Sequence, residues 1–124
     1  PMSSPTQRTL KLLRDEGYLA YVVERWCSFT HKRYDLFGII DVLAVKGSET
    51  LAVQTTSGSA VSARVKKMEA SEALPWLRDA GWTIHVHGWR KTKLKRGGKA
   101  MRWGCRTVDL TIPTTPTPPP TTHE

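Results

Sequence analysis

Two neighbouring apolar segments, each interrupted by one polar residue that is costly to bury, constrain the fold more than any other part of the sequence. Residues 36–45 are apolar except for one glycine and Asp41, and residues 51–56 repeat the pattern with Gln54 in the middle. The polar turn 46–50 between them favours a β-hairpin. A charge within an apolar strand is unfavourable unless it is paired or binds a metal ion. Asp41 and Gln54 are therefore the first candidates for a functional site.

The spacing within the second strand adds a third candidate. Side chains two residues apart in a strand lie on the same face, so Gln54 and Thr56 are expected to point the same way. If the two strands pair, the side-chain oxygens of Asp41, Gln54 and Thr56 would converge.

The segments around this hairpin predict a mixture of helices and strands. Residues 6–16 place Leu10 and Leu13 on one side of a helix that ends at Gly17. The other predicted elements are a strand over 18–26, a loop over 27–34, a helix from 60, a short helix over 74–80, a strand over 82–89 and a last strand over 103–112. This order predicts an α/β or α+β fold class with a small mixed sheet.

The charge of the chain favours a polyanionic partner. The sequence carries 19 Lys and Arg against 11 Asp and Glu, a net charge of +8. Seven cations lie around the turn dipeptide Gly97-Gly98, which predicts a basic β-ribbon; they are Arg90, Lys91, Lys93, Lys95, Arg96, Lys99 and Arg102. Cations placed against phosphates release condensed counterions, so nucleic acid is the expected partner. Charge alone also allows a solvated ribbon or an anionic membrane surface.

Length and composition predict one domain over residues 1–112, followed by a disordered Pro/Thr-rich tail over 113–124. The two cysteines match no metal-ligand or redox spacing. The first residues lack the apolar core of a secretory signal, and no apolar run approaches the roughly 20 residues of a membrane-spanning helix. We therefore expect a cytoplasmic protein.

Asp41, the triplet Gln54-Thr55-Thr56 on the next strand and the helix after them resemble the core of the PD-(D/E)XK nuclease superfamily. The pattern is most similar to its small Holliday-junction-resolvase-like members, including phage-encoded ones. Residues 33–41 and 54–58 are its more specific parts, and residues 7–13 are similar to the family's first helix, where an acidic residue usually stands at the place of Gln7. It implies a restriction-endonuclease-like mixed β-sheet flanked by helices and a homodimer. It also implies a Mg²⁺- or Mn²⁺-dependent endonuclease that hydrolyses phosphodiester bonds in branched or duplex DNA.

The resemblance also assigns roles to residues. Asp41 would be the main metal ligand, joined by the Gln54 amide oxygen and the Thr55 carbonyl. Gln54 replaces a glutamate of the family, and Thr56 replaces its lysine. The substitute cation would come from the following helix, from Arg64, Lys66 or Lys67.

Those two replacements leave other interpretations open. A nuclease fold without catalysis would bind nucleic acid through the ribbon and through Arg33, Arg64, Lys66 and Lys67. In a third interpretation the chain is a basic interaction protein, and Asp41 is only the partner of a buried cation.

Further acids and rings have two interpretations each. Asp35 could fold back as a second metal ligand or simply cap a turn. Glu24 is also a candidate ligand, although the sequence favours a surface residue or an ion-pair partner, and Gln7 is expected to face solvent. His85 and His87 are too few for a zinc site and are expected to face solvent or phosphate. The five Trp residues are expected mostly to pack in the core or on the ribbon.

Overall fold

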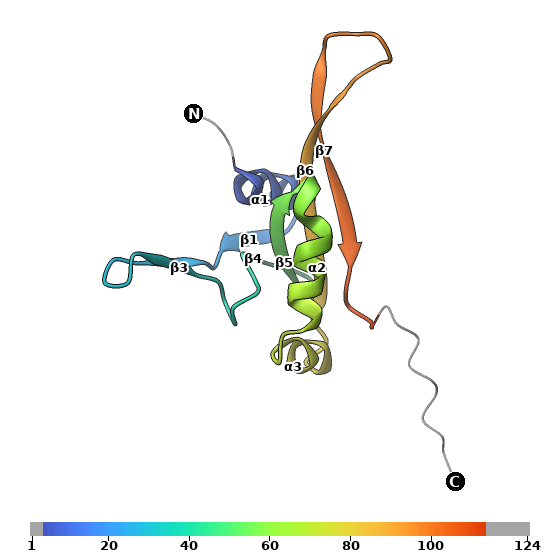
Figure 1. The fold of residues 1–124 in the computed structure, drawn as a ribbon. Helices are drawn as coiled ribbons and strands as arrows, with labels where there is room; N and C mark the ends of the chain where they lie inside the picture. The colour runs from blue at the N-terminus through green and yellow to red at the C-terminus, as the bar shows by residue number, and fades with distance from the viewer. Residues whose placement is uncertain (1–3, 114–124) are drawn as a thin grey trace, which may run out of the picture.

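A mixed five-stranded sheet forms the centre of the computed structural model, which describes residues 4–113 (Figure 1). The strands are β1 (Leu19–Val22), β2 (Arg25–Cys27), β3 (Lys32–Tyr34), β4 (Val42–Lys46), β5 (Glu49–Ser57), β6 (Thr83–Lys93) and β7 (Met101–Asp109). The helices are α1 (Pro5–Asp15), the short 3₁₀ helix η1 (Gly58–Ala60), α2 (Val61–Glu69) and α3 (Leu74–Asp79). The main sheet has the order β1-β4-β5-β6-β7, and β2 and β3 form a separate two-stranded sheet.

One pair of strands makes the sheet mixed. β5 and β6 run parallel, whereas β1–β4, β4–β5 and β6–β7 are antiparallel. The parallel pair needs a crossover connection, which η1, α2 and α3 supply. The α+β fold class with a mixed sheet flanked by helices is therefore confirmed.

Helices cover the two faces of the sheet and divide the core into two clusters. α1 packs Leu10 and Leu13 against one face, where Val42 and Val53 are fully buried. α2 and α3 cover the other face, with Met68, Leu74 and Leu77 in a cluster that includes residues of β5 and β6. Alternate residues of β5 therefore enter different clusters, as strand geometry requires.

The segment before β4 differs from the predicted strand. Residues 36–45 were expected to be one strand, but pairing with β5 begins at Val42. The preceding residues form a turn closed by the bridge between Leu36 and Ile40, with positive φ at Phe37 (55°) and Gly38 (77°). Asp41 consequently lies at the start of β4 and not in the middle of a strand.

The predicted strand 18–26 and loop 27–34 also need correction. The strand breaks after Val22, and its second part, β2, leaves the main sheet to pair with β3. β3 lies inside the predicted loop. This β2–β3 hairpin projects from the body of the molecule (Figure 1).

The basic ribbon is a continuation of the main sheet. β6 and β7 pair from His85–Asp109 to Lys93–Met101, so the predicted strand, ribbon and last strand are one long hairpin. Its turn contains Gly97 with φ 78°. The far end of this β6–β7 ribbon extends well beyond the other strands (Figure 1).

A close approach of α2 to the sheet depends on a glycine. Gly88 is buried in β6, and a Cβ atom at this position would overlap the Cγ2 atom of Val61, the first residue of α2. A Cβ there would also lie 3.3 Å from the backbone of Gly58. Only glycine lets η1 and α2 sit this close to β6.

The indole rings are less buried than expected. Among the described residues no Trp belongs to the buried core, and Trp26 and Trp76 are 58% and 77% exposed. The predicted tail lies outside the described residues except for Pro113. None of the helices described is long and apolar enough to cross a membrane.

Candidate functional site

The Asp41 carboxylate occupies the edge of β5 at the point where β4 no longer covers it. The Asp41 backbone N–H still donates to the Val53 carbonyl, at 2.9 Å. One step further along β5, the Thr55 backbone N–H donates to Asp41 Oδ2 at 2.8 Å, and the Thr55 hydroxyl donates to the same atom at 3.1 Å. The side chain of Asp41 thus accepts the hydrogen bond that a longer β4 would have accepted.

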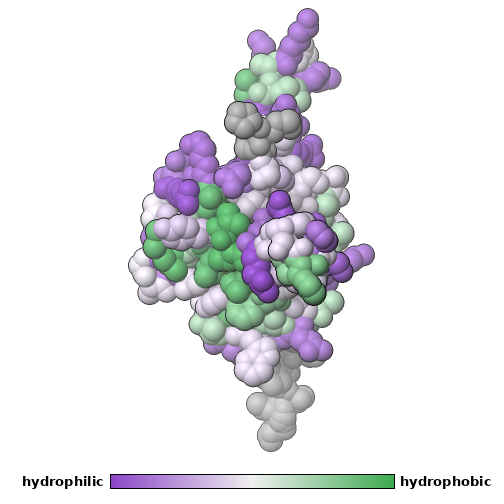
Figure 2. Space-filling view, turned by 90° about the vertical axis from the view of Figure 1, so that its left-hand side faces the viewer, coloured by the Kyte–Doolittle hydropathy of each residue, from purple (hydrophilic) through white to green (hydrophobic). Residues whose placement is uncertain are grey.

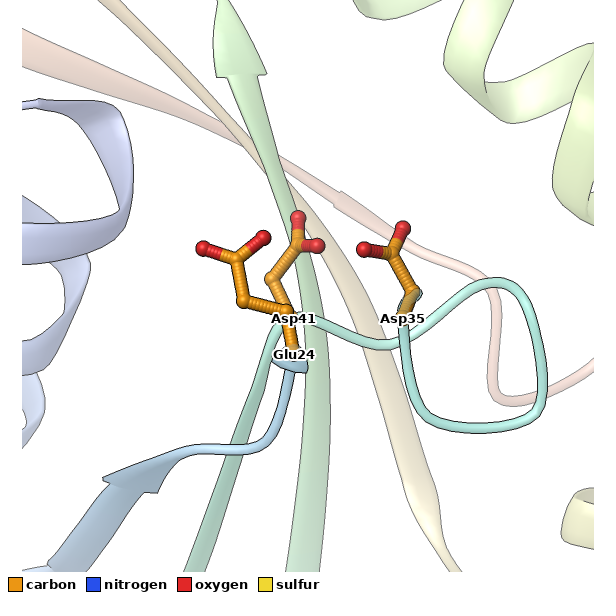
Figure 3. Close-up of side chains that lie close together, drawn as sticks. All are labelled: Glu24, Asp35 and Asp41. Carbon is orange, nitrogen blue, oxygen red and sulfur yellow. The ribbon is translucent and has the colours of Figure 1, made fainter. Parts of the chain in front are cut away.

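Two further acids lie beside Asp41 (Figure 3). Carboxylate oxygens of Glu24, Asp35 and Asp41 all lie within 4.8 Å of one another. Glu24 comes from the link between β1 and β2, and Asp35 from the turn after β3. We call these three residues the acidic cluster. Asp35 therefore folds back to lie beside Asp41, whereas its role as a metal ligand stays a prediction.

The acidic cluster lines a polar pocket of about 360 Å³. The wall on the other side comes from the first residues of α1 and the end of β5, where Thr6 and Thr55 share a hydrogen bond of 2.8 Å. Thr56 also lines this pocket. Gln7 does not contribute to the lining, and its side chain is exposed, as expected.

The environment of Asp41 disfavours its charged form. Burial, opposed by the Thr55 amide and assisted by the neighbouring Asp35 carboxyl, raises the pKa of Asp41 from 3.8 to about 6. Three carboxyl groups at this separation repel one another unless a proton or a cation lies among them. A proton or a cation placed among the three carboxyl groups would therefore stabilise the cluster.

Gln54 is buried beside the cluster, but its nitrogen faces the acids. Gln54 Nε2 donates to Asp41 Oδ2 at 2.5 Å and lies 3.5 Å from Asp35 Oδ2. The amide oxygen, Oε1, is buried without a hydrogen-bond partner. The predicted convergence of Asp41 with Gln54 occurs, although through the amide nitrogen. Half a turn about the last side-chain bond would exchange the two amide atoms.

The two threonines differ from their predicted roles. Thr55 contributes its N–H and hydroxyl to Asp41, whereas its carbonyl was expected to be the contributing group. Thr56 is 7% exposed and lines the pocket, but it carries no charge. Any positive charge beside the acids therefore comes from other residues.

Three cations surround the cluster. Lys67 Nζ lies 3.9 Å from Asp35 Oδ2, and Arg33 Nη1 lies 3.4 Å from Glu24 Oε1. Arg64 lines the same pocket. Lys66, in contrast, lies in a separate hollow of about 320 Å³ with Arg106 and Val108 of β7. Of the two lysines considered on this helix, α2 brings only Lys67 to the acids.

Glu24 is the member of the cluster that the sequence did not favour. The ion pair expected for it is present, since Arg33 contacts it. Its place beside Asp35 and Asp41 depends on the break between β1 and β2, where the Val23 N–H donates to the Asp41 carbonyl at 2.8 Å. The only local signal of that break is the charged pair Glu24-Arg25 within a segment that is otherwise rich in strand-forming residues.

The ribbon cations are remote from the cluster. All seven are exposed, and they follow β6, the turn and the start of β7. Lys91 and Arg8 both lie near the Trp103 ring, at 5.5 Å and 3.6 Å from its centroid. The base of the ribbon is thereby attached to α1.

The two histidines of β6 correct another expectation. His87 is 3% exposed, and its Nδ1 atom lies 3.0 Å from the Thr9 hydroxyl of α1, so it does not face solvent or phosphate. Burial, together with the nearby His85, lowers the pKa of His87 to about 4. His85 lies 3.7 Å from Asp109 on the neighbouring strand.

No protein-family model matches the sequence, and neither the curated proteins nor the solved structures give a significant match.

Proposed function

We propose that this chain is a metal-dependent DNA endonuclease of the PD-(D/E)XK kind, with a restriction-endonuclease-like fold. The observation that carries the proposal is the acidic cluster, with three carboxylates within 4.8 Å in a pocket that also contains cationic side chains. Such oxygen ligands suit Mg²⁺ or Mn²⁺. The net charge of +8 supports a polyanionic substrate.

The residues present fit a divalent cation on two grounds. The cluster holds three acids that repel one another, and Asp41 is desolvated, so a cation would relieve both effects. The buried Gln54 Oε1 atom has no partner, and a turn of the amide would present this oxygen to the acids. When bound, the metal would acidify a water molecule and neutralise charge developing on the phosphate.

The protein's own residues would divide the remaining work. Asp41 and Asp35 would hold the cation, with Glu24 completing the ligand set. Lys67 would supply the positive charge that Thr56 lacks, from a position already 3.9 Å from Asp35. Arg64, on the wall of the pocket, would bind the phosphate next to the scissile bond.

The surface supports substrate recognition by shape. The exposed cations of the β6–β7 ribbon are suited to phosphate contacts, which carry no sequence information by themselves. We therefore propose branched or duplex DNA as the substrate class, as for Holliday-junction resolvases.

A homodimer is supported by an uncovered part of the sheet. On the side where β1 and the β2–β3 hairpin lie, Figure 2 shows hydrophobic side chains gathered beside hydrophilic ones. Leu19 and Tyr21 of the edge strand β1 are 60% and 61% exposed, and Val45, the cross-strand partner of Leu19, is 40% exposed. An edge strand with exposed apolar residues favours association with a second copy.

A second candidate function has one observation in its favour. Without a metal, Asp41 Oδ2 already accepts hydrogen bonds from Gln54 and from the backbone and hydroxyl of Thr55. This satisfied arrangement would suit a nuclease fold that binds DNA without cutting it.

The deciding experiment is cleavage of labelled single-stranded, duplex, flap and four-way-junction DNA with Mg²⁺, Mn²⁺ or EDTA. We expect metal-dependent cutting by the wild type and none by Asp41→Ala. If the wild type cuts none of these substrates while salt-sensitive DNA binding persists, the second candidate function replaces the first.

A further inference from the structure

The β2–β3 hairpin is an element that contributes nothing to the core. All residues from Arg25 to Tyr34 are exposed or half-buried. Its three aromatic rings remain in water, with Trp26 58%, Phe29 91% and Tyr34 40% exposed. Aromatic side chains normally stabilise a fold by burying 150–250 Å² each. Here that stabilisation is largely forgone, so the rings are available to a ligand.

The same hairpin has the charge that DNA requires. Residues 25–34 contain the cations Arg25, Lys32 and Arg33 and no acid. The guanidinium of Arg25 lies 5.6 Å from the centre of the Tyr34 ring. Cations alternating with aromatic rings are the combination with which proteins bind single-stranded nucleic acid, because the rings stack on bases and the cations contact phosphates.

The two ends of the hairpin adjoin the acidic cluster. Glu24 immediately precedes β2, and Asp35 immediately follows β3, so two of the three acids stand at the two feet of the hairpin. Trp26 is the cross-strand partner of Arg33, and the two side chains therefore leave the same face of the ladder. Arg33 in turn reaches Glu24 at 3.4 Å. A ligand held on Trp26 would lie next to the cluster.

We propose that the β2–β3 hairpin binds unpaired bases of DNA through Trp26 and Phe29 and presents the adjoining strand to the acidic cluster. Phe29 lies in the four-residue turn at the tip, and the hairpin extends roughly 15 Å from its feet, at about 3.3 Å per residue. DNA with a single-stranded segment beside a duplex is then the preferred substrate. The duplex would lie on the β6–β7 ribbon, and the unpaired strand on the hairpin.

This inference deepens the proposed function and rests on it for the identity of the ligand as DNA. Binding is measured in EDTA, where no cleavage takes place, so the two ideas can fail separately. The probe is a fluorescently labelled oligo(dT), and the readout is anisotropy. The test variant combines Trp26→Ala with Phe29→Ala, and the matched control is Trp76→Ala, an exposed ring on α3.

We expect the test variant to bind oligo(dT) about a hundredfold more weakly, at about tenfold for each stacked ring. Trp76→Ala should bind like the wild type, and neither variant should change the affinity for blunt duplex. An oligonucleotide of abasic sites keeps the phosphates and lacks the bases. Wild type and test variant should therefore bind it equally.

Two results would overturn the proposal. The first is an equal loss of affinity for the abasic and the ordinary oligonucleotide, which would show that the hairpin contacts only the backbone. The second is unchanged oligo(dT) binding together with a smaller sedimentation coefficient, which would make the hairpin an interface between copies of the chain. Asp41→Asn separates the two ideas, because it should abolish cleavage and leave binding in EDTA intact.

Discussion

Two hairpins project from this molecule, and they differ in composition and in attachment. The β6–β7 ribbon continues the main sheet, so its cations stand on strands whose other ends are buried through Ile84 and Val86. The β2–β3 hairpin is a separate small sheet with no buried residue, and its feet are two acids of the cluster. The ribbon carries charge far from the cluster, whereas the hairpin carries aromatic rings next to it.

The two hairpins would therefore contribute differently to DNA binding, one to its affinity and the other to the position of the DNA. An array of cations on a firmly anchored ribbon binds phosphates wherever they occur along a helix. Aromatic rings beside the acidic cluster would stack only on bases that are unpaired. In the proposed function the ribbon would set how tightly DNA binds, and the hairpin would set which part of the DNA meets the acids.

The largest expected effect concerns the acids at the feet of the hairpin. Asp35→Asn and Glu24→Gln each remove one charge from the cluster while keeping the shape of the side chain. We expect each to reduce metal-dependent cleavage by on the order of a thousandfold, because a metal ion contributes several kcal/mol to the transition state. Single-turnover cleavage of a flap or junction substrate measures the loss.

Asp79→Asn, an exposed acid on α3, is the control for this pair and should cut at the wild-type rate. Binding to duplex in EDTA should persist in both cluster variants, since the ribbon is untouched. Full cleavage by Glu24→Gln would remove Glu24 from the site and leave only Asp35 and Asp41.

The next effect compares two neighbouring lysines on α2 that have different surroundings. Lys67 approaches Asp35 at 3.9 Å, whereas Lys66 lies with Arg106 and Val108 of β7. We expect Lys67→Met to lower kcat about a hundredfold, as for the loss of a positioned cation at a reacting phosphate. Lys66→Met should retain kcat. Equal kcat values in the two variants would contradict the assignment of Lys67.

A smaller effect should appear at the ribbon. Lys93→Gln combined with Arg96→Gln removes two phosphate contacts, which should lower the slope of log affinity against log salt by about 1.8 for duplex DNA and weaken binding about thirtyfold near 0.1 M salt. Lys11→Gln, on the exposed side of α1, is the control. Anisotropy titrations at several salt concentrations provide both quantities. An unchanged slope would mean that the ribbon does not contact phosphate.

The smallest effect is on the free energy of unfolding, to which the buried groups Asp41 and His87 contribute with opposite pH dependence. The raised pKa of Asp41 means that the folded state binds more protons than the unfolded state between about pH 4 and 6, so its contribution falls as the pH rises. The lowered pKa of His87 means that the folded state binds fewer protons between about pH 4 and 6.5, so its contribution rises with pH.

Single variants should separate these opposed contributions. In EDTA, the free energy of unfolding of Asp41→Asn should rise more steeply with pH than that of the wild type, and that of His87→Gln should fall. Each difference should be on the order of 1 kcal/mol across the window. Urea denaturation at both ends of the window measures it. Three identical pH profiles would mean that neither group titrates as described.

The sequence predicted the parts of the fold that depend on local patterns. The amphipathic spacing of Leu10 and Leu13, the β-hairpin that joins Asp41 to Gln54 and the basic ribbon around Gly97 all correspond to elements of the structure. These signals are local because periodicity and turn residues act over a few positions. The sequence also indicated that a cation of α2 could lie near the acids, but it did not distinguish Lys67 from Lys66.

The sequence did not show where strands break. Residues 18–26 are predicted as one strand despite the charged pair Glu24-Arg25, yet the chain leaves the main sheet after Val22, because β4 offers no partner beyond Val42. That missing partner also creates the site, since it frees the Thr55 N–H for the Asp41 carboxylate. Glu24 enters the cluster only through this break. Strand ends of this kind depend on pairing between segments far apart in the sequence, so the composition of one segment does not predict them.

The lack of a side chain at Gly88 affects how well the arrangement around the acidic cluster would survive substitution. Any larger residue would press on Val61 and lift α2 from the sheet. Lys67 reaches Asp35 from two turns further along that helix, at a separation close to the limit of an ion pair. Gly88 would then be among the least replaceable positions in the chain, although it lies outside the acidic cluster, because it sets the distance between α2 and the sheet and so the distance between Lys67 and Asp35.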